Sequence, residues 1–118
     1  MKLNFITFMV RDIEKSVAFY QDLAGLEVLR RLSPGAGKIV FLANRNGETM
    51  LELVQFDGGE KVSTKGMVIS FSAGENLVEL RENAVGLGYF PSEIIVGGPK
   101  PNHFTISDPD GVTVEFCA

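Results

Sequence analysis

The chain has 118 residues, of which 45% are hydrophobic and 22% charged, and this composition fits one globular domain with its own core. The formal charge of −4, with no basic cluster, argues against nucleic acid as a partner. No apolar run is long enough to span a bilayer and no signal-peptide pattern is present, so we expect no membrane partner. The single cysteine, Cys117, excludes an internal disulfide and predicts a cytoplasmic protein.

The first half of the chain begins with alternating apolar residues over 2–10, which predicts a strand. Asp12 is a typical N-cap for a helix that Gly25 ends, and apolar residues at helical spacing lie between them. Three further strands are predicted at 26–32, 38–43 and 49–56. Asn46-Gly47 indicates a hairpin between the last two of these strands.

The second half repeats this order. A strand is predicted over 67–73 and a helix over 76–85, which Gly86 and Gly88 terminate. Three strands should follow, at about 90–96, 102–107 and 112–116. In the last connection, Pro109 sets φ for the corner, Asp108 bonds the backbone ahead of it, and Gly111 takes a positive φ.

Each half therefore reads as strand, helix and three strands. We predict an α+β fold of two βαβββ modules, at about 1–57 and 65–118, within one domain covering 1–118.

Residues 10–20, 23–26 and 104–115 resemble the vicinal oxygen chelate superfamily, which includes glyoxalase I, extradiol dioxygenases, fosfomycin-resistance transferases and bleomycin-resistance proteins. The resemblance implies that the two modules form a cup-shaped mixed sheet with helices outside and a ligand or metal inside. It also implies a homodimer.

Active members of that superfamily hold a divalent metal with histidines and glutamates on the first and last strands of each module. The matching positions here are Phe5, Glu52, Val68 and Glu115, so both acids are present and both histidines are missing. Zn²⁺ and Ni²⁺ favour nitrogen or sulfur ligands, whereas Mg²⁺ and Mn²⁺ accept oxygen. We therefore expect a degenerate site without a metal cofactor. The alternative is a weakly held Mn²⁺ or Mg²⁺.

Three residues are candidates for catalysis, namely Glu115, Glu52 and His103. Two carboxylates close together in a partly apolar hollow would raise one pKa and give a general acid or base near neutral pH. Strand alternation places His103 on the same side as Glu115, where it would relay a proton or bind substrate. The competing interpretation is that both glutamates are solvated strand residues and His103 is a surface residue at the start of a strand.

A second set of side chains should line the cup and contact a small-molecule ligand: Phe5, Thr7, Met9, Met50, Val54, Val68 and Ser70. The competing interpretation is that they fill the space between sheets or a dimer interface. Arg30 and Arg31 either steer an anionic substrate or form an exposed pair, and the loop over 97–101 carries no phosphate-binding spacing. Cys117 has no histidine near it in the sequence, which makes a nucleophilic role improbable.

Three functions follow from these patterns. The first is a metal-independent small-molecule-binding protein of the bleomycin-resistance type. The second is a divergent glyoxalase-like lyase or isomerase in which Glu52 and Glu115 move a proton next to a carbonyl. The third is a regulatory or immunity module that has kept the scaffold and lost its chemistry.

Overall fold

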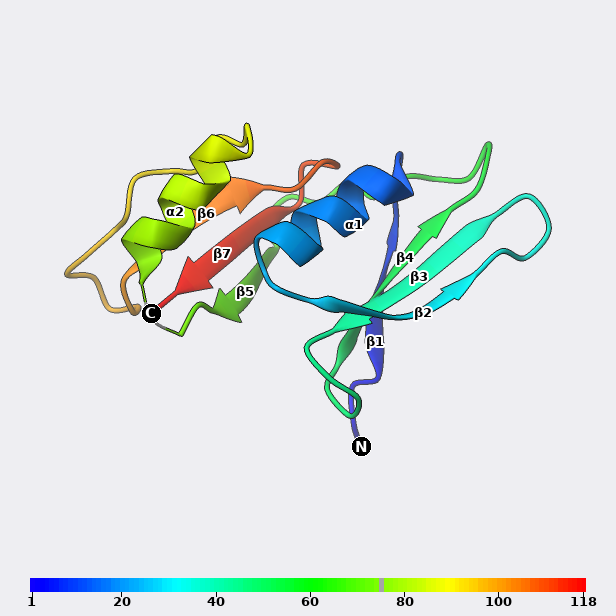
Figure 1. Cartoon of the computed structure of the whole chain (residues 1–118), viewed down its shortest axis with the longest axis horizontal. Helices are drawn as coiled ribbons and strands as arrows, with labels where there is room; N and C mark the ends of the chain where they lie inside the picture. The colour runs from blue at the N-terminus through cyan, green and yellow to red at the C-terminus, as the bar shows by residue number, and fades with distance from the viewer. Residues whose placement is uncertain (75) are drawn as a thin grey trace. The chain divides into compact units, whose positions relative to one another are not determined.

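The computed structural model describes residues 1–74 and 76–118, which form two compact units, Met1–Ser63 and Thr64–Ala118. Each unit consists of one mixed sheet and one helix (Figure 1). Within this described part of the chain, no helix has the length and apolar character needed to cross a membrane.

The first unit is a complete βαβββ module. Its elements are β1 (Phe5–Met9), α1 (Ile13–Asp22), β2 (Glu27–Leu32), β3 (Lys38–Ala43) and β4 (Met50–Gln55). The sheet order is β1-β4-β3-β2, with β1 parallel to β4 and the other neighbours antiparallel. The predicted hairpin at Asn46-Gly47 is confirmed, since it joins β3 to β4.

Capping and burial explain where α1 begins and which face it packs. The Asp12 carboxylate accepts a hydrogen bond from the backbone N of Lys15 at 3.1 Å, as predicted for an N-cap. The amide oxygen of Gln55 accepts a second one, from the backbone N of Ile13 at 2.8 Å, and so ties the helix start to β4. Apolar residues of helix and sheet are buried together in the core: Phe8, Ile13, Val17, Tyr20, Leu42 and Leu53.

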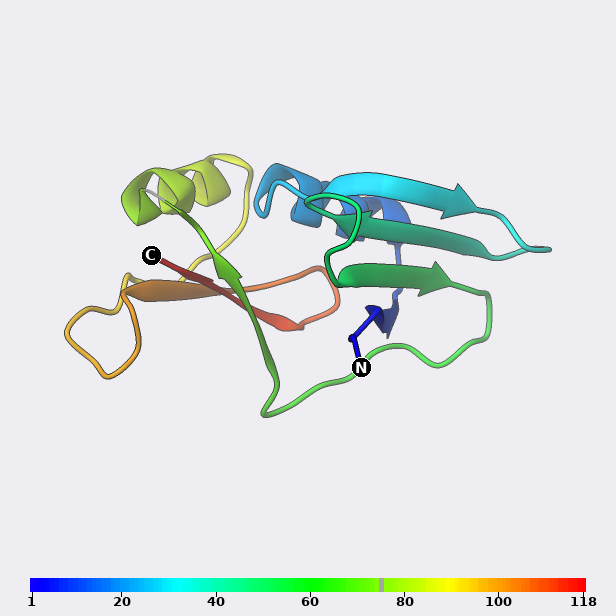
Figure 2. The ribbon, with the colours of Figure 1, turned by 90° about the horizontal axis from the view of Figure 1, so that it is seen from below.

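The second unit contains β5 (Val68–Ser72), α2 (Leu77–Gly86), β6 (His103–Ser107) and β7 (Thr113–Cys117). The sheet order is β5-β7-β6, with β5 parallel to β7 and β6 antiparallel to it. Helix α2 lies along one face of this sheet, as the two views in Figures 1 and 2 agree. The turn between β6 and β7 is built as predicted, because buried Asp108 accepts hydrogen bonds from the backbone N atoms of Asp110 and Val112 and Gly111 has a φ of 85°.

The strand predicted over about 90–96 is wrong. Only Ile95 forms a β-bridge, with His103. Pro91 has no N–H to donate, and the backbone N of Thr105 donates to the side-chain Oγ of Ser92 at 2.9 Å instead of to a backbone carbonyl. The segment therefore runs beside β6 without forming a regular ladder, and the second unit is a βαββ module with one extra bridge.

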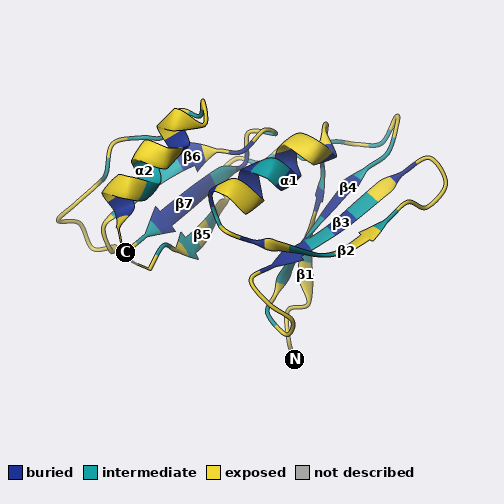
Figure 3. Ribbon diagram, viewed as in Figure 1, coloured by how far each residue is buried: buried dark blue, intermediate teal, exposed yellow. Residues whose placement is uncertain are grey.

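The predicted α+β class with mixed parallel and antiparallel pairing is confirmed, and the strands form one sheet in each unit. Burial alternates along the strands, so each sheet has one face against its helix and one face that carries polar or partly exposed residues (Figure 3). In β6, for example, buried Phe104 and Ile106 alternate with His103 and Thr105. All the candidate site residues come from these second faces, and Val54 is buried on its face.

Candidate functional site

The second face of the first sheet brings together Thr7 and Glu52, which lie opposite each other in the parallel β1–β4 pair. The Thr7 Oγ1 donates a hydrogen bond to Glu52 Oε1 at 2.5 Å. Phe5 and Met50 form the neighbouring pair on the same face of these two strands. Val54 is only 6% exposed and therefore offers little surface to a ligand, whereas Phe5, Thr7, Met9 and Met50 are exposed or partly exposed.

An apolar pocket opens beside this pair. It has a volume of about 330 Å³ and is lined by Phe5, Leu29, Arg30, Phe41, Asn46 and Met50. The rings of Phe5 and Phe41 meet edge to face, with centroids 5.4 Å apart. Two of the predicted ligand-binding residues, Phe5 and Met50, thus contribute to an actual cavity.

The second face of the other sheet is organised around Glu115, whose residue is only 3% exposed. Its carboxylate accepts hydrogen bonds from Ser70 Oγ at 2.9 Å, from Cys117 Sγ at 3.0 Å and from Lys100 Nζ at 2.5 Å. Ser70 lies opposite Glu115 in the β5–β7 pair, while Lys100 reaches it from the loop before β6. Both carboxylate oxygens are therefore engaged by donors of the chain itself.

These contacts set the charge of the cluster. The hydrogen bonds from Lys100 and then Cys117 lower the pKa of Glu115 to about 2, against the raising effect of burial. The same contact with Glu115 raises the pKa of Lys100. The prediction of a raised carboxyl pKa is therefore wrong for Glu115, because a lysine ammonium rather than a second carboxylate is its nearest charged neighbour.

His103 lies beside Glu115, on the predicted side of the sheet. Its Nε2 is 3.7 Å from Glu115 Oε2 and its side chain is 12% exposed, so the position is a sheltered one and not the open strand end. The ring Nδ1 lies 2.8 Å from the carbonyl oxygen of Pro101. A carbonyl only accepts, so Nδ1 is the donor in this contact and Nε2 faces the Glu115 carboxylate.

The comparisons with known proteins agree with the fold. Residues 2–116 match the model of the Glyoxalase/Bleomycin resistance protein/Dioxygenase superfamily. The chain belongs to this superfamily. The vicinal oxygen chelate resemblance is thus confirmed over nearly the whole chain.

Three proteins similar to this chain share 20–28% of their residues with it. It is 28% identical to the Bacillus subtilis (strain 168) protein YwbC, described as uncharacterized, over 98% of this chain and 95% of that protein. The structure is similar to Leishmania major glyoxalase I, with a TM-score of 0.81 and 22% identity over 99% of this chain and 86% of the other. It is also similar to TnmS3, an antibiotic binding protein from Streptomyces sp. CB03234, with a TM-score of 0.76 and 20% identity over 99% and 94% of the two chains.

The residues at the four positions that the resemblance assigns to metal ligands do not fit a metal. Phe5 and Val68 have no donor atom, Glu52 accepts from Thr7, and the Glu115 carboxylate holds the Lys100 ammonium. In the described residues, no group of three or more His, Cys, Asp and Glu side chains is arranged to hold an ion. We therefore derive no chemical step through a metal.

Two members of the Glu115 cluster, Lys100 and Cys117, were not among the predicted site residues. Cys117 could have been found from the turn at Asp108–Gly111, because that turn pairs His103 with Cys117 across β6 and β7. The spacing of Glu115 and Cys117 then places the thiol on the face of the carboxylate. No periodicity marks Lys100, since it lies in a loop between Pro99 and Pro101.

Proposed function

We propose that this chain is a small-molecule-binding protein that sequesters its ligand without a catalytic metal. One observation carries the proposal: the Lys100 ammonium lies 2.5 Å from Glu115, at a position where superfamily members place a metal ligand. The carboxylate is neutralised by a tethered cation and has no oxygen left without a protein donor. The printed role of TnmS3, antibiotic binding, supports this class of function for a similar fold.

In this proposal, each unit supplies its own ligand-contacting residues from its partly exposed second face. Thr7, Met9 and Ser70 remain proposed contacts, together with Phe5 and Met50 in the pocket and Val68, which is half exposed. Because Lys100 neutralises the charge of Glu115, the proposed role for Glu115, Glu52 and His103 is to shape and polarise the surface rather than to move protons.

The lyase or isomerase alternative is less well supported by the charges. A general base works best when its pKa lies near the operating pH, and the pKa of Glu115, lowered to about 2, makes this carboxylate a weak base. We also propose, from the superfamily resemblance and the single cysteine, a homodimer acting in the reducing cytoplasm. Light scattering of the purified chain tests the dimer.

The test of the proposed function is a thermal-shift screen of small molecules, antibiotics included, on protein stripped of metals by a chelator. We expect hits whose affinity is unchanged when Mn²⁺, Ni²⁺ or Zn²⁺ is added, and whose mass is unchanged after incubation with the protein. A ligand that binds only with a stoichiometric metal, or that is converted to product by the wild type but not by Glu115→Gln, would contradict the proposal.

A further inference from the structure

The pocket of the first unit owes its charge to an irregularity in β2. Val28 lies opposite Leu42, but the next residue on β3, Phe41, lies opposite Arg30, so Leu29 is an extra residue in the strand. Such a β-bulge redirects the side chains around it. Leu42 is fully buried, whereas Phe41 and Arg30 line the pocket together with Leu29. The bulge therefore delivers a guanidinium to an otherwise apolar cavity.

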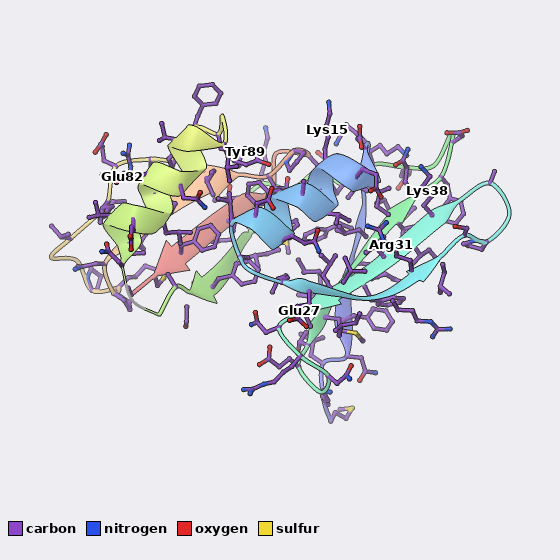
Figure 4. All side chains as sticks on the ribbon, viewed as in Figure 1. Lys15, Glu27, Arg31, Lys38, Glu82 and Tyr89 are labelled. Carbon is purple, nitrogen blue, oxygen red and sulfur yellow. The ribbon has the colours of Figure 1, made fainter. Side chains whose placement is uncertain are left out.

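Arg30 has no ion-pair partner in residues 1–74 and 76–118. Its neighbour Arg31, which Figure 4 labels, behaves differently, because it forms an ion pair with Glu14 of α1 at 2.8 Å. On the other side of Phe41, the opposite residue on β4 is Glu52. The Glu52 carboxylate accepts a hydrogen bond from Thr7, and Glu52 does not line the pocket. Arg30 thus presents an uncompensated positive charge to the cavity.

The other residues that line the pocket determine which groups the ligand needs besides its negative charge. Phe5, Leu29, Phe41 and Met50 supply apolar and aromatic walls, and Asn46 is the second polar group. A volume of about 330 Å³ lies at the small end of the range for small-molecule sites. Guanidinium groups bind planar carboxylates through two parallel hydrogen bonds, and aromatic rings pack against Phe edges and faces.

We propose that this pocket binds a small aromatic carboxylate, with the carboxylate on Arg30 and the ring against the Phe5–Phe41 pair. The proposal rests on the proposed small-molecule-binding function and names its ligand class and its site. This pocket differs from the Glu115 cluster, in which the charge of the carboxylate is already paired with Lys100 of the same chain.

The probe is 2-naphthoate, with uncharged 2-naphthamide as its isosteric control, titrated into the full chain by calorimetry and by amide chemical-shift mapping. We expect shifts at Phe5, Leu29, Arg30 and Met50, and affinity about tenfold weaker for the amide, which loses one charge-assisted contact. Arg30→Met should weaken the affinity for naphthoate by a similar factor. Arg30→Lys keeps the charge but loses the two parallel hydrogen bonds of the guanidinium, so its affinity should lie between those of the wild type and Arg30→Met.

Arg31→Met is the matched control, because it removes the same charge from the adjacent residue and should leave naphthoate affinity unchanged. Equal affinities for acid and amide, equal effects of the two Arg→Met variants, or shifts confined to other residues would each overturn the inference. So would the absence of naphthoate binding. Hits from the metal-free screen that map elsewhere would then leave the proposed function standing, whereas metal-dependent or converted hits would remove that function independently of Arg30.

Discussion

The thiol of Cys117 lies 3.0 Å from Glu115 Oε1 and 3.3 Å from Ser70 Oγ. The Ser70 hydroxyl lowers the pKa of this thiol, but the acceptor and negative charge of Glu115, together with burial, raise it more, and the net pKa is raised. The only cysteine of the chain is therefore a hydrogen-bond donor to the carboxylate and not a thiolate nucleophile.

This relationship predicts slow thiol chemistry. Iodoacetamide should modify Cys117 in the native protein more slowly than in urea-unfolded chain, with the rate rising only at higher pH, because the thiolate is the reactive form. In Glu115→Gln the negative charge is lost, so the pH midpoint of alkylation should fall. Ser70→Ala removes the group that lowers the pKa and should move the midpoint in the opposite direction. A native midpoint at or below that of the unfolded chain would contradict this reading.

The lowered pKa of Glu115 predicts a defined acid sensitivity. The folded-state pKa, about 2, is below the ordinary value of 4.5, so the deprotonated group stabilises the fold above pH 4.5. That contribution is lost as pH falls from 4.5 towards 2. Denaturant titrations across this interval should show the free energy of unfolding decreasing with falling pH in the wild type.

The same titrations on Glu115→Gln should show a smaller decrease, because Gln does not titrate. Lys100→Met removes the largest cause of the lowered pKa and should make the loss of stability below pH 4.5 smaller. Lys65→Met is the control from the same unit, since Lys65 is exposed and, among the described residues, is not an ion-pair partner of Glu115. Identical pH profiles for the wild type and Lys100→Met would contradict the assignment.

The turn between β6 and β7 should depend on Asp108. Its Oδ1 accepts from the backbone N atoms of Asp110 at 2.8 Å and Val112 at 2.9 Å, and the residue is buried. Asp108→Ala leaves these donors without a partner and should cost about 2 kcal/mol in the free energy of unfolding. Asp108→Asn keeps one oxygen acceptor and should cost less. Urea unfolding of the two variants measures the difference, and equal costs would show that the acceptor atom is unimportant.

Gly37 lies where a side chain would collide with the ring of Phe56. Gly37→Ala should force that ring to move and cost about 1–2 kcal/mol in the free energy of unfolding. Gly86 is the control, because a methyl group there meets nothing within 4 Å and the residue lies in α2. Gly86→Ala should be neutral or stabilising by up to about 1 kcal/mol. Thermal and urea unfolding compare the two, and a neutral Gly37→Ala would contradict the packing argument.

Local chemistry predicted much of this fold. Alternation identified β1, the Asp12 cap identified the start of α1, and the turn after Asp108 identified the β6–β7 hairpin. That hairpin also fixes His103, Glu115 and Cys117 on one face, so part of the cluster follows from the sequence.

Other features depend on contacts that periodicity does not encode. The missing strand near Ile95 results from a side-chain oxygen of Ser92 replacing a backbone acceptor, and the position of Arg30 results from one extra residue in β2. Lys100 reaches Glu115 from an irregular loop. All three features depend on tertiary contacts or on strand register, which the local sequence pattern does not specify. Each of them alters the candidate site more than it alters the fold.

The loop that carries Lys100 is closed at its base by the Ile95–His103 bridge and by a hydrogen bond from Ala118 N to Asn102 O. Residues 97–102 are all exposed and supply nothing to the hydrophobic core. The net charge of this sheet face therefore depends on a loop residue, Lys100, that contributes nothing to the hydrophobic core. Replacing Lys100 would leave the buried Glu115 with only its Ser70 and Cys117 donors and would turn a neutral ion pair into a net negative charge on this face.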